Sequence, residues 1–308
     1  MMARRISLLI GIVLIVSFAV GCGQSSSTTT TTSSTTTTTS GGGSHNLRNI
    51  FFLHHSTGRE LTMGFYEDEY PLGSPEAIGV RKYINNYNTS HGTSFRYWDH
   101  DYNNIGVTDP DGNLTGYSYN IPNGPHGDEG DTSPEGLHTL WTSTDAVAVA
   151  ARTRILASHE VIAFKSCFSE ASIADENQLD TYKNYYLDMR QVFDAHPEKF
   201  FVVISFPPLH RNTPEYPDDI AANTRSFANW LKSTGSGGFL NGNHPNIACF
   251  DLFDYLAAAS TEASGVRDRL KQVYEFTAIG DNSHPNSLAA TTVGQIFGAF
   301  LINKALSY

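Results

Sequence analysis

Short apolar runs alternate with longer amphipathic segments through most of this chain. Runs of four to six residues, rich in aromatic and β-branched side chains, predict buried strands at 49–53, 94–98, 161–164, 200–205 and 247–250. Apolar residues at three- and four-residue spacing predict helices at 76–86, 133–155, 178–195, 219–233, 262–276 and 287–306. Because strands that alternate with helices favour right-handed crossovers, the pattern predicts an α/β fold: a five-stranded parallel sheet in a three-layer α/β/α sandwich.

Polar or turn-forming residues follow four of these strands. They lie at His54–Ser56, Asn104–Gly106, Lys165–Cys167 and Pro207–Pro208. In parallel sheets, ligands bind where the carboxyl ends of the strands meet the loops that follow them. We therefore expect the four turns to share one edge of the sheet and to line a cleft there.

The stretch Asp281-Asn282-Ser283-His284-Pro285-Asn286 carries the clearest candidate chemistry. A carboxylate three residues before a histidine can bond one imidazole nitrogen while the other faces a cleft, which is the arrangement of a general base and its orienting acid. The alternative is structural: Asp281 caps the helix that begins near Ser287, and His284 packs over it. The nucleophile has to come from elsewhere in the chain.

The first 45 residues predict export and tethering. Arg4 and Arg5 precede an apolar run that ends in Ala-Val-Gly-Cys22, which has the form of a secretory signal at residues 1–21 and resembles a bacterial lipobox. The resemblance implies that Cys22 becomes the lipid-modified N-terminus; a plain signal anchor is the alternative. Residues 22–45 are almost purely Ser, Thr and Gly and predict a flexible tether, which leaves 46–308 as one folded domain.

Charge restricts the partners of this domain. Loss of the signal leaves 18 basic and 31 acidic residues, a net charge of −13. Such a surface repels polyanions, so we expect no nucleic-acid ligand and no membrane contact except through the lipid anchor. Cys167 and Cys249 remain after lipidation of Cys22, and two thiols alone do not make a disulfide framework.

Several blocks of the chain together resemble the SGNH, or GDSL-type, hydrolases. The blocks are a serine turn after the first strand, a glycine after the second, a polar turn after the third, prolines after the fourth and a late Asp-x-x-His-Pro. The resemblance extends from Ile50 to Leu306 and is strongest at residues 281–286. It implies a flavodoxin-like fold with strand order 2-1-3-4-5 and hydrolysis of a short acyl ester, such as an O-acetylated carbohydrate, without a cofactor or metal ion. In that strand order one strand separates Cys167 from Cys249, so both thiols are expected to stay free.

Position by position, the resemblance assigns roles to four residues. Ser56 matches the family's nucleophile, His284 its general base and Asp281 its orienting acid. Gly106 falls where the family has its oxyanion-hole glycine, and the backbone N–H of Ser56 is a second donor. The structural alternative for Ser56 is a helix N-cap.

The third block departs from the family pattern. The chain has Lys165-Ser166-Cys167-Phe168 where the family usually has glycine, a variable residue, asparagine and aspartate. Cys167 then stands near the asparagine that donates to the oxyanion, and a thiol donates poorly, which leaves Ser166 or Lys165 to replace it. His55 also replaces the usual aspartate before the serine. His55, Lys165 and His210 are the other candidates for the cleft.

Two hypotheses from different classes follow. In the first, the chain is an exported serine esterase that acts through Ser56, His284 and Asp281. In the second, it is a binding module at the cell surface that keeps the fold and the cleft but has lost turnover. Metal chemistry is a poor fit, because adjacent side chains of a strand, such as His54 and His55, point to opposite faces. The run Asp109–Asn113 has the spacing that begins a calcium loop but lacks the rest and predicts a turn.

Overall fold

The computed structural model describes residues 47–65, 78–124, 130–214, 216–261, 265–277 and 280–308, all within one compact unit, Gly43–Tyr308. The predicted signal peptide, 1–21, and tether, 22–45, with the lipidation candidate Cys22, lie outside the described residues. Within them, no helix is long and apolar enough to cross a lipid bilayer.

A mixed sheet lies at the centre of the described unit. Its strands follow the order β3-β2-β1-β4-β5-β6. Their bounds are β1 Asn49–Leu53, β2 Arg96–His100, β3 Val107–Thr108, β4 Val161–Lys165, β5 Phe200–Ile204 and β6 Ile247–Phe250. The five longer strands are parallel to one another and have the order that the family resemblance implies.

The prediction of five parallel strands is wrong at one edge of the sheet. A sixth strand, β3, pairs antiparallel with β2, so the sheet is mixed. The chain reverses at Gly106, where φ is +78°, and only two residues then pair with β2. A two-residue strand is too short to show an alternating pattern in the sequence, which is why it was missed.

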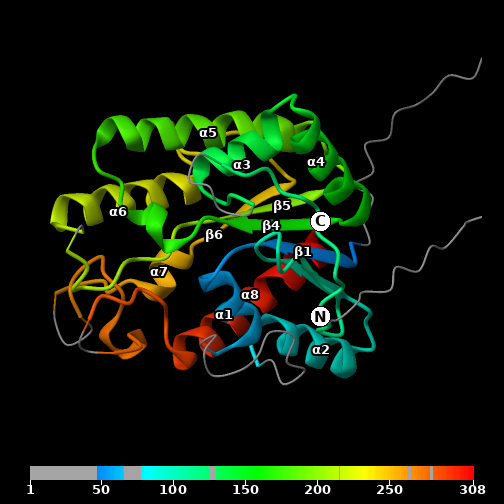
Figure 1. Ribbon diagram of the computed structural model, residues 1–308, viewed down its shortest axis with the longest axis horizontal. Coiled ribbons are helices and arrows are strands. Elements are labelled where there is room, and N and C mark those ends of the chain that lie inside the picture. Colours follow the sequence, from blue (N-terminus) through cyan, green and yellow to red (C-terminus); the bar gives the residue numbers. More distant parts are fainter. Residues whose placement is uncertain (1–46, 66–77, 125–129, 215, 262–264, 278–279) are drawn as a thin grey trace, which may run out of the picture. The chain divides into compact units, whose positions relative to one another are not determined.

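Helices cover both faces of this sheet (Figure 1). Alternate side chains of the strands pack into two separate cores, with Phe51 and Leu53 in one and Ile50 and Phe52 in the other. The first core is covered by α3 Pro134–Thr142, α4 Ala146–Ser158, α5 Glu176–Asp194 and α6 Asp218–Lys232. The second is covered by α1 Thr57–Met63, α2 Val80–His91, α7 Leu252–Leu256 and α8 Ser287–Ser307. The predicted three layers are therefore present.

The predicted helices need three corrections. The segment 133–155 forms two helices, because Asp145 caps a new helix by accepting a hydrogen bond from the Val147 N–H at 2.8 Å. Helix α2 begins at Val80, later than predicted, and residues 66–77 lie outside the described chain. The helix predicted at 262–276 is wrong in its described part, 265–276, which holds only the 3-10 turn η3, Gln272–Tyr274.

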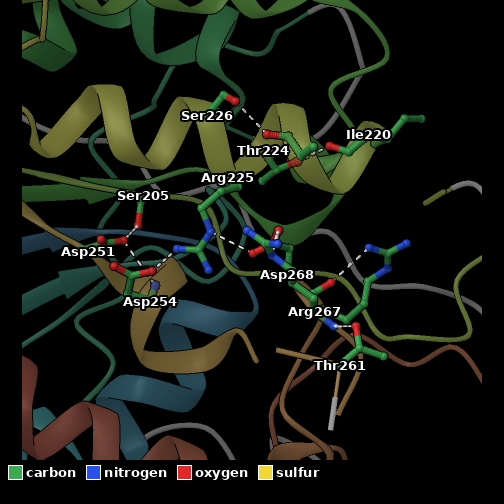
Figure 2. A network of polar contacts seen from close by, with 12 residues as sticks. Ser205, Ile220, Thr224, Arg225, Ser226, Asp251, Asp254, Thr261, Arg267 and Asp268 are labelled. Atoms are coloured by element: carbon green, nitrogen blue, oxygen red, sulfur yellow. Dashed lines mark hydrogen bonds and ion pairs between the residues drawn. The ribbon is translucent and has the colours of Figure 1, made fainter. Parts of the chain in front are cut away.

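A network of ion pairs explains why that segment is not helical (Figure 2). Asp268 adopts a positive φ of 61° and accepts a hydrogen bond from Arg225 Nε at 2.8 Å. Arg225 lies on α6 and also pairs with Asp254 on α7. Asp251, at the end of β6, accepts a hydrogen bond from Ser205 Oγ at 2.9 Å. Tertiary contacts between α6, α7 and this segment thus override its helical pattern.

Candidate active site

The serine turn after β1 has an unusual backbone. Ser56 has φ 42° and ψ −101°, a region that side-chain-bearing residues rarely adopt. The turn is held by close packing behind it, since a Cβ at Gly58 would lie 2.3 Å from His54 Cβ. Ser56 occupies the N-cap position of α1, but its side chain makes no capping hydrogen bond. The hydroxyl is therefore available to another partner.

That partner is His284. Ser56 Oγ and His284 Nε2 are in direct hydrogen-bond contact, although the two residues are 228 positions apart in the chain. The ring of Phe168 meets the imidazole edge-on, with centroids 4.8 Å apart. The structure thus brings together the two residues expected from the sequence as nucleophile and base.

The second nitrogen of the imidazole faces a different residue from the one expected. His284 Nδ1 lies 2.9 Å from Asn282 Oδ1, which also accepts the His284 backbone N–H at 3.0 Å. Asp281 is exposed, and none of the described hydrogen bonds joins its carboxylate to His284. Asp281 does not cap α8 either, because Asn286 does so by accepting from the Ala289 N–H at 3.1 Å. Among the described residues, the Asn282 amide and not a carboxylate orients the ring.

Ser56 and His284 open onto a cavity of about 470 Å³, which we call the serine cavity. Its lining residues are His55, Ser56, Arg59, Tyr102, Asp131, Thr132, Ser133, Cys167, Phe168, Ser169, Glu170 and His284. A second hollow of about 380 Å³ shares Phe168, Ser169 and His284 with it and also contacts Asp281 and Asn282. Of the residues expected in the cleft or oxyanion hole, His55, Ser56 and Cys167 line the serine cavity.

Gly106 does not line the cavity. Its N–H donates to the Tyr102 carbonyl at 2.7 Å, so it is already used. A Cβ at this position would lie 2.3 Å from the Tyr117 carbonyl oxygen, which accounts for the glycine by close packing. The backbone N–H groups of Ser56 and Cys167, in contrast, donate to no other described residue.

Lys165 and Ser166 are fully buried behind the cavity wall and do not line it. Lys165 Nζ donates to the Ser166 carbonyl at 3.1 Å, and burial lowers the pKa of this ammonium despite nearby Cys167, Glu60 and Asp101. Burial, together with the charges of His54 and Lys165, lowers the pKa of His55 to about 2. His55 is therefore neutral at the cavity wall across the physiological range.

His210 is likewise outside the cavity, but it supports the histidine loop. Its backbone N–H donates to Ser283 Oγ at 2.9 Å, and its Nε2 lies 3.1 Å from the Thr277 carbonyl. Asn212 Nδ2 reaches the Gly280 carbonyl at 3.0 Å. The loop after β5 thus holds the backbone that carries His284.

Several residues of the cavity wall are not predicted from the sequence. Arg59 lies on α1, Tyr102 follows β2, Asp131 precedes α3 and Glu170 lies in the 3-10 turn η2, Phe168–Ala171. Tyr102 stacks on His55 with ring centroids 3.8 Å apart. A more accurate end for β2 would have placed Tyr102 at the sheet edge; the other three carry no signal in the sequence.

Among the described residues, no group of three or more His, Cys, Asp or Glu side chains is placed to hold a metal ion. No family model, curated protein or solved structure matches this chain. The fold and the site therefore define a class by geometry alone: an α/β protein with a serine and a histidine in contact at the carboxyl edge of its sheet.

Proposed function

We propose that this chain is a divergent serine ester hydrolase of the SGNH type that acts on a short acyl ester. The observation that carries the proposal is the contact between Ser56 Oγ and His284 Nε2 at a strained turn. Nucleophile and base within hydrogen-bond reach, with the base oriented by a third group, are what acyl transfer requires. Strained backbone is also concentrated at functional sites.

In the proposed reaction, Ser56 Oγ attacks the ester carbonyl carbon while His284 Nε2 takes the hydroxyl proton. The tetrahedral intermediate collapses, and the imidazolium gives its proton to the leaving alkoxide. Water then attacks the acyl-enzyme, His284 again serves as base, and the free acid and Ser56 are restored. The Asn282 amide oxygen accepts from Nδ1 and keeps that nitrogen protonated, so that Nε2 is the basic one.

We assign the oxyanion donors to the backbone N–H groups of Ser56 and Cys167. Both residues line the serine cavity, and neither N–H has another described partner. Backbone donors remove the need for the asparagine that the SGNH pattern has at this block, because the thiol of Cys167 does not have to donate. Gly106, whose N–H is bonded to Tyr102, is not included in this assignment.

A fluorophosphonate probe tests the proposal, since only an activated serine reacts with it. We expect labelling of the parent protein, complete loss in Ser56→Ala, and retention in Ser169→Ala, a matched control because Ser169 lines the same cavity. Hydrolysis of p-nitrophenyl acetate should follow the same pattern. Equal labelling of the parent and Ser56→Ala would reject Ser56 as the nucleophile.

A second candidate function is a binding module without turnover. The observation that favours it is the commitment of the Gly106 N–H to Tyr102, which removes the oxyanion donor expected there. A protein of this kind would remain unlabelled by the fluorophosphonate while still binding a ligand in the serine cavity.

The location we propose is the bacterial envelope, through lipid attached to Cys22. The support is the lipobox-like sequence before that cysteine. Labelled palmitate should be incorporated by the parent chain and not by Cys22→Ser; incorporation by both would exclude this anchor.

A further inference from the structure

Acidic side chains outnumber basic ones around the serine cavity. Asp131 and Glu170 line it, and Arg59, the arginine among its described lining residues, is paired with the buried carboxylate of Asp101. Behind the wall, the buried Lys165 lies near Glu60, and burial lowers the pKa of this ammonium, while His55 at the wall is neutral. Among the described side chains that line the cavity, acidic groups therefore outnumber basic ones that lack an acidic partner.

Asp131 is built into the wall. Its side chain is almost fully buried, with the residue 4 % exposed, and its Oδ1 accepts the Ser133 N–H at 2.6 Å at the start of α3. Glycines at 124 and 136 make room for it, since a Cβ at either position would lie within 3 Å of its side-chain atoms. Asp131 Oδ2 is buried and has no partner among the described residues. A buried carboxylate oxygen of this kind is stable only when it receives a hydrogen bond or a counter-ion.

Glu170 is fixed on another wall of the same cavity. Tyr182 OH donates to its Oε2 at 3.1 Å, and Ser169 Oγ lies 3.4 Å from its Oε1. Burial and the neighbouring Glu170 carboxylate raise the pKa of Tyr182, so the phenol stays protonated as a donor. Tyr182 and Ser169 thus hold the Glu170 side chain in place at the cavity wall.

Two aromatic rings complete this environment. Phe168 and Tyr102 both line the cavity, Phe168 against His284 and Tyr102 against His55. The negative faces of aromatic rings attract cations, and combined with carboxylates they form the usual surroundings of an organic ammonium ion. A neutral acyl group makes no use of these charges.

We infer that the serine cavity selects esters whose alcohol part carries an ammonium group, held by Asp131 and Glu170 beside Tyr102 and Phe168. The inference rests on the proposed function, because it names the class of ester that the same site cleaves. The acyl carbon lies at Ser56, and the cationic part of the alcohol occupies the remainder of the cavity. Anionic esters of equal size are excluded by the same carboxylates.

A set of three acetate esters of similar size tests the selectivity. Acetylcholine is cationic, 3,3-dimethylbutyl acetate is its neutral isostere, and 3-acetoxypropanoate is anionic. We expect kcat/KM to be at least about fivefold higher for the cation than for the neutral ester, the range of a partly desolvated cation–π and ion-pair contact, and lowest for the anion. Asp131→Asn and Glu170→Gln should each reduce the preference. Asp180→Asn, which removes an acid that is 70 % exposed on α5, should keep it.

A second measurement tests the charge preference of the cavity without depending on ester hydrolysis. Cys167 lines the cavity, so its modification by a trimethylammonium and by a sulfonate methanethiosulfonate reagent can be compared in Ser56→Ala by mass spectrometry of its peptide. We expect the ratio of the two modification rates, cationic over anionic, to be at least about fivefold higher for Cys167 than for free mercaptoethanol. Glu170→Gln should lower this ratio.

The two measurements separate the inference from the function on which it rests. Hydrolysis of all three esters at equal rates would overturn the ammonium selectivity and leave the esterase standing. Charge-selective modification of Cys167 with no hydrolysis of any ester would overturn the esterase and leave a cation-binding cavity. Equal modification of Cys167 by the two reagents would show that the cavity does not favour cations and would overturn the inference.

Discussion

At the scale of single residues, the orientation of His284 is decided by its neighbour two positions earlier. The Asn282 amide oxygen contacts both the Nδ1 atom and the backbone N–H of His284, which fixes the ring with one side chain. An amide holds the tautomer as a carboxylate does, but it does not stabilise the imidazolium by charge. Asp281 lies next in the chain and faces solvent.

Replacement of the two neighbours distinguishes their roles. Asn282→Ala should lower kcat on a short p-nitrophenyl ester by about tenfold or more, because the wrong tautomer becomes accessible. Asp281→Ala should stay within about twofold of the parent, since an exposed surface charge contributes little at a distance. Asn282→Asp is the rescue variant and should restore turnover. The assignment fails if Asp281→Ala is the more damaging of the two single-alanine changes.

At the scale of elements, the strands of this fold were the most predictable part. Apolar runs such as Phe51–Leu53 and Phe200–Ile204 are buried on both faces, so their composition alone identifies them. Elements set by tertiary contacts were not predictable. The segment around Asp268 has helical spacing in the sequence, but its carboxylate is bound by Arg225 from α6 and its backbone pairs with residues after α7. Neither partner is visible in a local pattern.

The junction between β5 and α7 depends on one buried hydroxyl. Ser205 Oγ donates to Asp251 and accepts the Phe253 N–H at 2.9 Å, at the carboxyl ends of β5 and β6. Ser205→Ala should therefore lower the free energy of unfolding by about 1–3 kcal/mol, because the buried Phe253 N–H loses its acceptor and Asp251 Oδ1 loses one of its two donors. Ser226→Ala, an exposed serine on α6 in the same view (Figure 2), should change it by less than about 0.5 kcal/mol. Urea unfolding measures both, and equal effects would mean that the junction is held by other contacts.

At the scale of the whole molecule, three buried histidines link stability to pH. Burial lowers the pKa of His55 to about 2, of His100 to about 4 and of His159 to about 3, in the last case with help from Lys199. The unfolded chain protonates each near pH 6.5, well above the folded value. Unfolding therefore takes up protons below pH 6.5, so stability is complete above that pH and is lost as pH falls.

The size of this loss can be measured on one histidine. Between pH 7.5 and 5.5 each such group should remove up to about 1.4 kcal/mol of unfolding free energy. His159→Gln should reduce the loss of unfolding free energy between these pH values by about 1.4 kcal/mol. Glutamine does not titrate, so it takes up no proton when the chain unfolds. Urea unfolding at the two pH values gives the comparison. An unchanged decline in the variant would show that His159 is protonated in the folded protein.

The site was predictable to the extent that it depends on strand ends. Ser56 and Cys167 follow from the positions of turns at the carboxyl edge of a parallel sheet, and His284 follows from its place three residues after Asp281. The cavity walls that carry the charge pattern do not, because Arg59, Asp131 and Glu170 come from three segments whose meeting depends on the packing of α1, α3 and η2. Charged residues in such segments look like ordinary solvated positions in the sequence.

The two ends of the described domain lie near the amino ends of the strands, whereas the serine cavity lies at their carboxyl ends. Leu47 leads into the amino end of β1, and the final residue, Tyr308, packs its ring on Phe200, the first residue of β5, with centroids 5.3 Å apart. The cavity is built at the carboxyl ends of the same strands. A bead, a tag or a display scaffold joined at either end of the described domain therefore attaches away from the cavity, so the opening of the serine cavity should stay accessible when the domain is immobilised.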